Sequence, residues 1–435
     1  MWIREKIQAL SWKINLGVDV VRQNIMSTTN QLTAELHAVE GVRTASVCAN
    51  IRYPDRLDLV LIELAPESSV AGVFTQNAFC AAPVQVAKKH LAEAIHTGSA
   101  HRYLVINTGN ANAGTGDGGV VDALSCCRSI ADMAGVPISN VLPFSTGVIG
   151  EKLPMDKIVP AIPDAFLKLG SQNWQDAAAG IMTTDTRPKA ISRKIALHGK
   201  TIVITGIAKG SGMIKPNMAT LLAFVFTDAQ IEQDLLKQLL RDNVSATFNR
   251  ISVDGDTSTN DSCLLVASGK GGVSVTRENS ASLSKFSTTL REVFVELAQG
   301  LIRDAEGATK FVTIHVQQGS TSEECLRVAY AIAESPLVKT ALFASDPNWG
   351  RILAVVGRAD IVNLNINELT IDLGNVRIVE NGTVSAGYTE TAGQEVMDRE
   401  DIDITVSLAR GQFEETVWTS DLSHDYIRIN AEYRT

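Results

Sequence analysis

Short apolar runs alternate with amphipathic patterns along most of this 435-residue chain, beginning near Arg56. RLDLVLIEL (56–64) alternates and then becomes continuously apolar, as a buried strand does. VQVAKKHLAEAI (84–95) instead has the three- and four-residue apolar spacing of a helix. Similar patterns predict helices over 118–134, 230–247, 281–304 and 322–334, strands over 103–107, 201–207, 220–227, 262–267 and 310–316, and a strand-rich stretch from about 360. The alternation predicts a mixed α/β fold.

The alternating region contains no Pro-, Gly- or Ser-rich hinge, internal repeat or low-complexity linker. Two separately folding domains are therefore not expected. At the N-terminus we expect a poorly ordered or loosely attached extension over residues 1–35. Lys13 and Asp19 interrupt its apolar stretch, which disfavours a signal peptide. A basic amphipathic transit peptide is the alternative, although Glu5 and Asp19 are unusual in one.

The formal charge is −9, from 39 Lys and Arg against 48 Asp and Glu. Nucleic acids and anionic membranes bind proteins that have a dense basic surface, which a chain with this negative charge is not expected to have. We therefore expect the partner to be a small molecule. The charge is uneven along the chain. Residues 1–219 hold 21 basic and 17 acidic side chains (net +4), whereas residues 220–435 hold 18 and 31 (net −13).

The six cysteines show neither a CxxC pair nor a regular spacing, so they predict neither a zinc ribbon nor a disulfide framework. Cysteines of this kind are typical of a reducing compartment. No apolar run approaches the roughly 18 residues of a membrane-spanning helix. We therefore expect a cytoplasmic protein.

The sequence carries no familiar cofactor motif. Three Gly-rich passages lack the P-loop and dinucleotide-binding patterns; they are NTGNANAGTGDGG (107–119), KGSGM (209–213) and SGKGG (268–272). DGDTSTND (254–261) lacks the ligand spacing of a calcium loop and predicts a polar, tightly turned loop. The seven histidines have no zinc-site spacing and accompany no GxSxG motif. If the chain is an enzyme, its nucleophile should not depend on histidine.

The most informative stretch is IAKGSGMIKPNMATLLAFVFTDA (207–229), in which a Gly- and Pro-containing loop leads directly into Thr220. Thr220 opens the apolar run TLLAFVF, and threonine is in any case a frequent strand residue. The alternative interpretation is that Thr220 becomes an N-terminal nucleophile once the bond after Ala219 is cut. Its α-amine, with a reference pKa near 7.7–8.0, would then serve as general base to its own hydroxyl.

Acyl transfer also requires hydrogen-bond donors that face the developing oxyanion. FSTGVIGEKLP (144–154) places Thr146 and Gly147 after the apolar VLPF, where we expect a tight polar turn. Thr146 offers a hydroxyl, and Gly147 offers a backbone N–H that no side chain shields. Turns of this composition are frequent, so the segment alone does not establish a site.

Taken together, several long motifs resemble the ornithine acetyltransferase family, also called the bifunctional glutamate N-acetyltransferases. They occur in the family's order between about residue 38 and Thr435. The motifs are STGVIGEKLP (145–154), TTDT (183–186), KGSGMIKPNMAT (209–220), DGDTSTNDS (254–262), RDAEGATK (303–310), SDPNWGRI (345–352) and INAEYRT (429–435).

The resemblance implies an αββα layered sandwich similar to the N-terminal-nucleophile hydrolases, with the family's own topology. It implies self-cleavage between Ala219 and Thr220 into an α chain (36–219, preceded by the extension) and a β chain (220–435), which form one intertwined catalytic unit and an α2β2 assembly. The implied reaction is a ping-pong transfer of acetyl from N2-acetylornithine through Thr220 to glutamate. No metal or organic cofactor is implied, and acetyl-CoA is a candidate co-substrate.

The family's functional residues carry over by motif. Thr220 is the implied nucleophile, and Thr146 and Gly147 form the implied oxyanion hole. The implied substrate-binding residues are Thr183, Lys209, Thr220, Glu306, Asn430 and Thr435. Lys209 and Glu306 suit a substrate that carries a carboxylate and a distal ammonium. Two alternatives stay open: a self-cleaving amide hydrolase or aminopeptidase of related fold, and an uncleaved, metal-dependent protein that uses the 254–261 loop.

Overall fold

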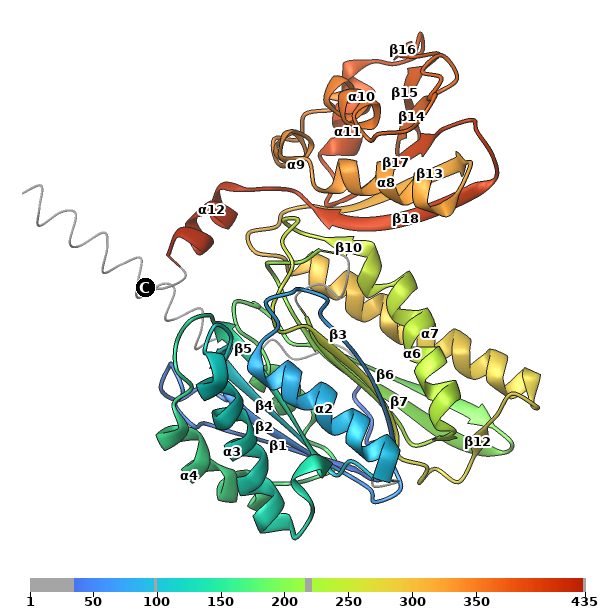
Figure 1. Cartoon of the computed structure of the whole chain (residues 1–435). Helices are drawn as coiled ribbons and strands as arrows, with labels where there is room; N and C mark the ends of the chain where they lie inside the picture. Colours follow the sequence, from blue (N-terminus) through green and yellow to red (C-terminus); the bar gives the residue numbers. More distant parts are fainter. Residues whose placement is uncertain (1–34, 98–99, 216–220, 433–435) are drawn as a thin grey trace, which may run out of the picture. The chain divides into compact units, whose positions relative to one another are not determined.

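The computed structural model describes residues 35–97, 100–215 and 221–432 (Figure 1). The expected extension over 1–35 therefore lies outside the described residues except for its last position. The predicted site residues Ala219, Thr220 and Thr435 also lie outside them.

Two β-sheets form the centre of the fold. The first has the order β1-β2-β4-β5, in which only β4 and β5 are parallel; its strands are β1 (Val42–Val47), β2 (Leu59–Leu64), β4 (Tyr103–Asn110) and β5 (Val141–Val148). The second has the order β3-β11-β8-β7-β6, in which only β11 and β8 are parallel; its strands are β3 (Ser69–Phe74), β6 (Lys189–Leu197), β7 (Lys200–Lys209), β8 (Leu222–Thr227) and β11 (Ser262–Ala267).

The two sheets pack face to face through one apolar core. Alternate residues of β2, β4 and β5 meet alternate residues of β7, β8 and β11 there. Phe144 of β5 and Phe224 of β8 make an edge-to-face contact across the sheets, with ring centroids 5.1 Å apart. Helix α5 (Trp174–Gly180) adds Trp174 to this core, 5.1 Å from Phe226 between ring centroids. Burial of aromatic surface from both sheets holds the layers together.

Helices cover the outer face of each sheet (Figure 1). On the first sheet, three helices share a core with β1, β2 and β4; they are α2 (Ala82–Thr97), α3 (Gly116–Ala134) and α4 (Met155–Leu167). On the second sheet, α6 (Gln233–Ala246) and α7 (Ser280–Arg303) pack their apolar stripes against β7, β8 and β11. The layers are therefore α, β, β and α, which confirms the predicted sandwich.

A third sheet lies beyond the sandwich and has its own core. Its order is β10-β18-β13-β17-β14-β15-β16, with strands β10 (Ile251–Ser252), β13 (Phe311–Gly319), β14 (Thr370–Leu373), β15 (Val376–Glu380), β16 (Thr383–Val384), β17 (Asp401–Ser407) and β18 (Phe413–Ser420). Its helices are α8 (Ser322–Ala333), α9 (Pro336–Phe343), α10 (Trp349–Gly357) and α11 (Glu390–Met397). Helix α12 (His424–Ala431) follows β18 and ends the described chain.

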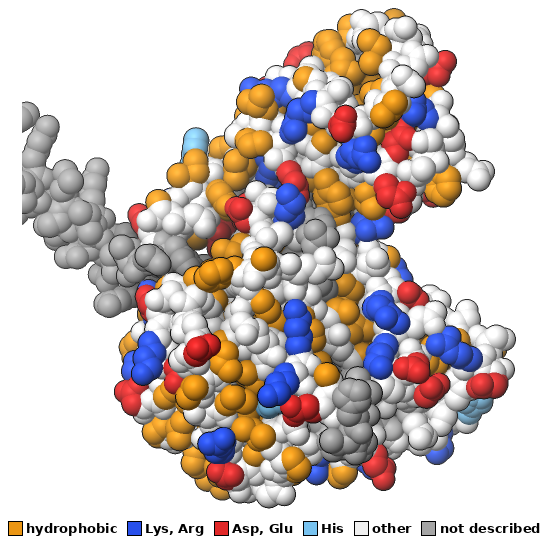
Figure 2. Space-filling view, viewed as in Figure 1, with side chains coloured by type: hydrophobic (Ala, Val, Ile, Leu, Met, Phe, Trp, Pro, Cys, Tyr) orange, Lys and Arg blue, Asp and Glu red, His pale blue; other side chains and the backbone are white. Residues whose placement is uncertain are grey.

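The remaining described elements are short. They are η1 (Ile138–Asn140), η2 (Phe248–Arg250), β9 (Gln230–Ile231) and β12 (Ser274–Val275). The strand β9 explains why the helix predicted from residue 230 begins at Gln233. Within the described ranges, no helix combines the length and hydrophobicity that crossing a membrane requires. On the face shown in Figure 2, basic and acidic side chains are interspersed.

We expect Phe224→Ala to destabilise the fold by about 3–5 kcal/mol, because the ring is fully buried between the sheets and its removal leaves a cavity. The matched control is Phe79→Ala, since Phe79 is 62% exposed. We expect the control to change stability by less than about 0.5 kcal/mol. Urea unfolding curves of the two variants check this, and equal midpoints would show that the inter-sheet contact contributes little.

Candidate functional site

Thr146 and Gly147 lie inside strand β5, opposite β4. The turn expected at this position is therefore wrong. The strand register shifts where Gly109 meets Gly147, and Gly147 has a φ of 137°. A Cβ atom on Gly147 would lie 2.3 Å from the carbonyl carbon of Gly109, so only glycine fits. A polar segment typical of turns is thus accommodated as an irregular strand end.

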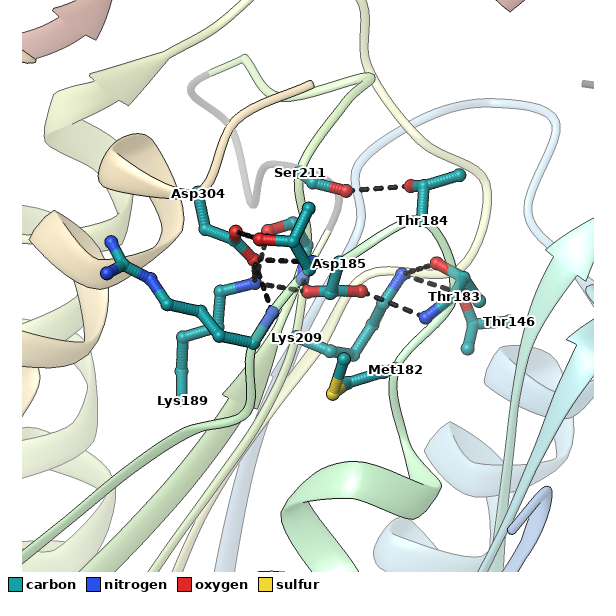
Figure 3. Close-up of polar contacts among 12 residues, drawn as sticks. Thr146, Met182, Thr183, Thr184, Asp185, Lys189, Lys209, Ser211 and Asp304 are labelled. Atoms are coloured by element: carbon teal, nitrogen blue, oxygen red, sulfur yellow. Dashed lines mark hydrogen bonds and ion pairs between the residues drawn. The ribbon is translucent and has the colours of Figure 1, made fainter. Parts of the chain in front are cut away.

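Lys209 is the last residue of β7, and its side chain crosses to the strand that carries Thr146 (Figure 3). The ammonium donates hydrogen bonds to Thr183 Oγ1 at 2.7 Å and to Thr146 Oγ1 at 3.2 Å. Lys209 is only 4% exposed. The structure therefore brings together three predicted site residues from three separate segments.

A buried ion network lies next to Lys209 (Figure 3). The ammonium of Lys189 donates to both Asp185 and Asp304, and all three side chains are nearly inaccessible to solvent. Asp185 also accepts from the backbone N–H groups of Thr183 at 2.9 Å and Gly210 at 2.8 Å. The carboxylate thus holds the TTDT turn and the loop after β7 in fixed positions.

The network sets the pKa values of its neighbours. Burial alone would raise the pKa of Asp185, but the charges of Lys189 and Lys209 outweigh it and hold that pKa well below the usual range. Burial lowers the pKa of Lys209, as does the charge of Lys189, whereas Asp185, Glu306 and Asp261 act in the opposite direction. Lys209 is thus a buried cation with acidic groups around it.

Glu306 and Asn430, which the motifs predicted as substrate-binding residues, lie in contact. Asn430 on α12 donates from Nδ2 to Glu306 Oε2 at 2.7 Å. The N–H of Glu306 donates to the carbonyl of Ser211 at 2.8 Å, in the loop that follows Lys209. In that loop, a Cβ on Gly212 would lie 2.4 Å from Glu306 Oε2, so the glycine allows the backbone to approach the carboxylate.

A cleft of ≈ 200 Å³ opens beside Gly147 and Thr183. Arg56 lines it and donates to the carbonyls of Met182 at 2.8 Å and Thr183 at 3.0 Å. Ile429 of α12 also lines the cleft. The cleft therefore adjoins the TTDT segment, the end of β5 at Gly147 and helix α12.

The 254–261 segment is a loop between β10 and β11, as predicted. Asp254 accepts from the N–H groups of Met213 at 2.6 Å and Ile214 at 3.0 Å, and from the Tyr426 hydroxyl at 3.2 Å. Burial raises the pKa of Asp254. In the parts of the chain that the structure describes, no group of three or more His, Cys, Asp or Glu residues is arranged to hold a metal ion.

The described part of the site thus contains Thr146, Gly147, Thr183, Lys209 and the Glu306–Asn430 pair. The motifs assigned no role to Asp185, Lys189 or Asp304. Asp185 lies within the TTDT motif and Asp304 within the RDAEGATK motif, so their positions in these motifs could have pointed to them. Lys189 lies in none of the motifs. Chemically, the site offers hydrogen-bond donors, an ammonium group and a carboxylate.

Comparison with known proteins agrees with the resemblance seen in the motifs. The chain is 51% identical over 401 residues to the arginine biosynthesis bifunctional protein ArgJ of Pseudomonas fluorescens, covering 92% of this chain and 98% of that protein. It is 52% identical over 397 residues to the protein of the same name from Methylococcus capsulatus, covering 91% and 96%.

The crystal structure of arginine biosynthesis bifunctional protein ArgJ from Bacillus halodurans is 35% identical over 48% of this chain and 98% of that chain, with a TM-score of 0.46. The model of the ArgJ family matches residues 43–435. Because that match extends over nearly all of the chain, and curated relatives share half of its residues, the chain belongs to the ArgJ family.

Proposed function

We propose that this acyltransferase of arginine biosynthesis moves an acetyl group from N2-acetylornithine to glutamate through an acetyl ester on Thr220. The observation that carries the proposal is the buried Lys209, which donates to Thr183 and Thr146. In the loop directly after Lys209, the Ser211 carbonyl accepts from the N–H of Glu306, which brings a carboxylate next to the ammonium. This arrangement suits a substrate that carries a carboxylate and a distal ammonium group.

In the first half-reaction, the Thr220 hydroxyl attacks the acetyl carbonyl, and the ester forms as the C–N bond to ornithine breaks. The hydroxyl proton passes by way of the Thr220 amine to the leaving nitrogen. In the second half-reaction, the amine of glutamate attacks the ester and the C–O bond to Thr220 breaks. The proton that the glutamate nitrogen loses passes by way of the Thr220 amine to the released Thr220 oxygen. Thr146 and Gly147 donate hydrogen bonds to the oxyanion of each tetrahedral intermediate. The substrate is bound by Thr183, Lys209, Glu306, Asn430 and Thr435.

The Thr220 amine becomes available through self-cleavage after Ala219. The two pieces would share the second sheet, because β3, β6 and β7 precede the cut and β8 and β11 follow it. We therefore propose that they remain associated, as α and β chains of an α2β2 assembly in the cytoplasm. We also propose acetyl-CoA as a second acetyl donor, which would suit the word bifunctional in the name of the relatives. Neither a metal nor an organic cofactor takes part.

We expect the purified enzyme, dialysed against a chelator, to form N-acetylglutamate from N2-acetylornithine and glutamate with equimolar release of ornithine. Mass spectrometry of the products checks this, with acetyl-CoA replacing N2-acetylornithine in a parallel reaction. Net release of acetate without N-acetylglutamate would instead indicate the hydrolase. Loss of activity that returns with added metal would contradict the cofactor-free mechanism.

We expect Thr220→Ala to abolish both self-cleavage and transfer, since one hydroxyl performs both reactions. Intact-mass measurement should show a single chain for the variant, whereas wild-type protein gives two fragments, one of which begins with TLLAF. Thr220→Ser keeps a hydroxyl and is the matched control, in which cleavage and some activity should persist. A cleaved or active alanine variant would remove Thr220 from its proposed role.

We expect Glu306→Gln to slow the half-reaction with N2-acetylornithine by about 10–100-fold, the loss of one hydrogen bond between charged groups. The rate of the half-reaction with glutamate should decrease less, because glutamate carries no distal ammonium. Rapid-quench measurement of each half-reaction checks this. Glu296→Gln is the matched control, since Glu296 lies on α7 and pairs only with Arg193 among the described residues. Equal losses in both half-reactions would contradict the assignment of Glu306 to the ammonium.

A further inference from the structure

Two consecutive side chains at the end of the 254–261 loop reach two different sheets of the sandwich. Asn260 and Asp261 directly precede β11, which is the parallel neighbour of β8. They are 7% and 1% exposed. The mechanism described above uses neither residue, although both are polar and buried.

Asn260 attaches this loop to the first sheet. Its Nδ2 donates to the carbonyl of Ser145 at 2.9 Å and to the carbonyl of Ala111 at 2.6 Å. Its Oδ1 accepts from the Thr259 hydroxyl at 2.6 Å. The side-chain amide thus donates to two carbonyls of the β4–β5 region. One of those carbonyls belongs to Ser145, the residue directly before Thr146.

Asp261 attaches the same loop to the strand that follows Thr220. Its Oδ1 accepts from the N–H of Leu221 at 3.1 Å, and that nitrogen forms the peptide bond with Thr220. The Leu221 carbonyl in turn accepts from the N–H of Ser262 at 3.1 Å. The other oxygen, Oδ2, is buried and has no hydrogen-bond partner among the described residues. Burial raises the pKa of this carboxyl well above its usual range, against the charge of Lys209.

These contacts matter because the two strands that flank the proposed reaction, β5 and β8, belong to different sheets. Thr146 lies on β5 of the first sheet, and Leu221 leads into β8 of the second. The core between the sheets is apolar, and apolar packing is non-directional. Hydrogen bonds with defined geometry fix atoms more closely, and a misplacement of about 1 Å costs on the order of 10²-fold in rate.

We propose that Asn260 and Asp261 are positioning residues that fix the oxyanion segment of β5 relative to the nucleophile end of β8. Asn260 holds the residue before Thr146, and Asp261 holds the residue after Thr220. This inference rests on the proposed function. It assigns to DGDTSTND a purpose other than metal binding: the loop sets the spacing between two catalytic segments.

The test compares the kinetics of Asn260→Ala, Asp261→Ala and Asp261→Asn with those of the wild type. We expect both alanine variants to lower kcat for acetyl transfer by about 10–100-fold, because the reacting groups lose their alignment. KM for N2-acetylornithine should stay within about twofold, since no substrate-binding residue changes. Asp261→Asn keeps an acceptor for the Leu221 N–H, so it should recover at least about tenfold of the rate lost in Asp261→Ala.

The matched control is Thr257→Ala, in the same loop. Thr257 accepts from Asn77 Nδ2 at 3.1 Å, and no described contact joins its side chain to β5 or β8. We expect wild-type kinetics from it. Thermal unfolding of every variant measures the folded fraction, and Asn260→Ser, which keeps one donor, replaces the alanine variant if that variant does not fold.

Three results would overturn the inference. They are wild-type kcat in both alanine variants, a loss confined to KM, and a loss equal to the decrease in folded protein. Failure of the proposed function is distinguishable, because the wild-type enzyme itself would then show neither transfer nor self-cleavage. A wild type that performs both, together with variants that match it, contradicts only the positioning role.

Discussion

The antiparallel pairing of β7 with β8 is the constraint on which the site depends. Lys209 at the end of β7 stands opposite Leu222 at the start of β8, so these two strand ends lie side by side at one end of the second sheet. Every residue of β8 is buried, and the strand has neighbours on both sides. A one-residue shift in the register of β8 would exchange the large side chains that pack in one core with the small side chains that pack in the other. Lys209 and the start of β8 are therefore held together at one end of one sheet.

The cost of burying charge explains why the ion network is complete. The network buries three charged groups, which are the carboxylates of Asp185 and Asp304 and the ammonium of Lys189. Desolvation opposes each of these charges. Removing one partner of a buried pair costs about 3–5 kcal/mol, whereas a complete pair roughly balances its own desolvation. The network therefore contributes geometry more than stability. Through Asp185 it holds the N–H groups of Thr183 and Gly210 together, which keeps the Thr183 hydroxyl within reach of Lys209.

Elements with strong periodicity were predictable from sequence, and features that depend on distant strands were not. The strand predicted over 262–267 is β11, and the helix predicted over 281–304 is α7 (Ser280–Arg303), because apolar spacing decides both. The Ser-Thr-Gly segment at 145–147 has the composition of a turn, and only its pairing with β4 makes it a strand. The family motifs supplied most of the site. Lys189 gave no signal, because a lysine in an alternating strand is usually solvated and its two carboxylate partners are set by tertiary structure.

The order of strands in the second sheet also shows which force would hold the two chains together after cleavage, the attraction between their opposite charges or the burial of apolar surface. Residues before position 220 supply β3, β7 and β6, and later residues supply β8 and β11 between them. Separating the pieces after a cut at Ala219 would break the pairing of β3 with β11 and of β7 with β8, and would expose both faces of the sheet. Attraction between a +4 and a −13 piece is screened over about 8 Å at physiological salt. Apolar burial is not screened in this way, so it, rather than charge, would hold the cleaved chains together.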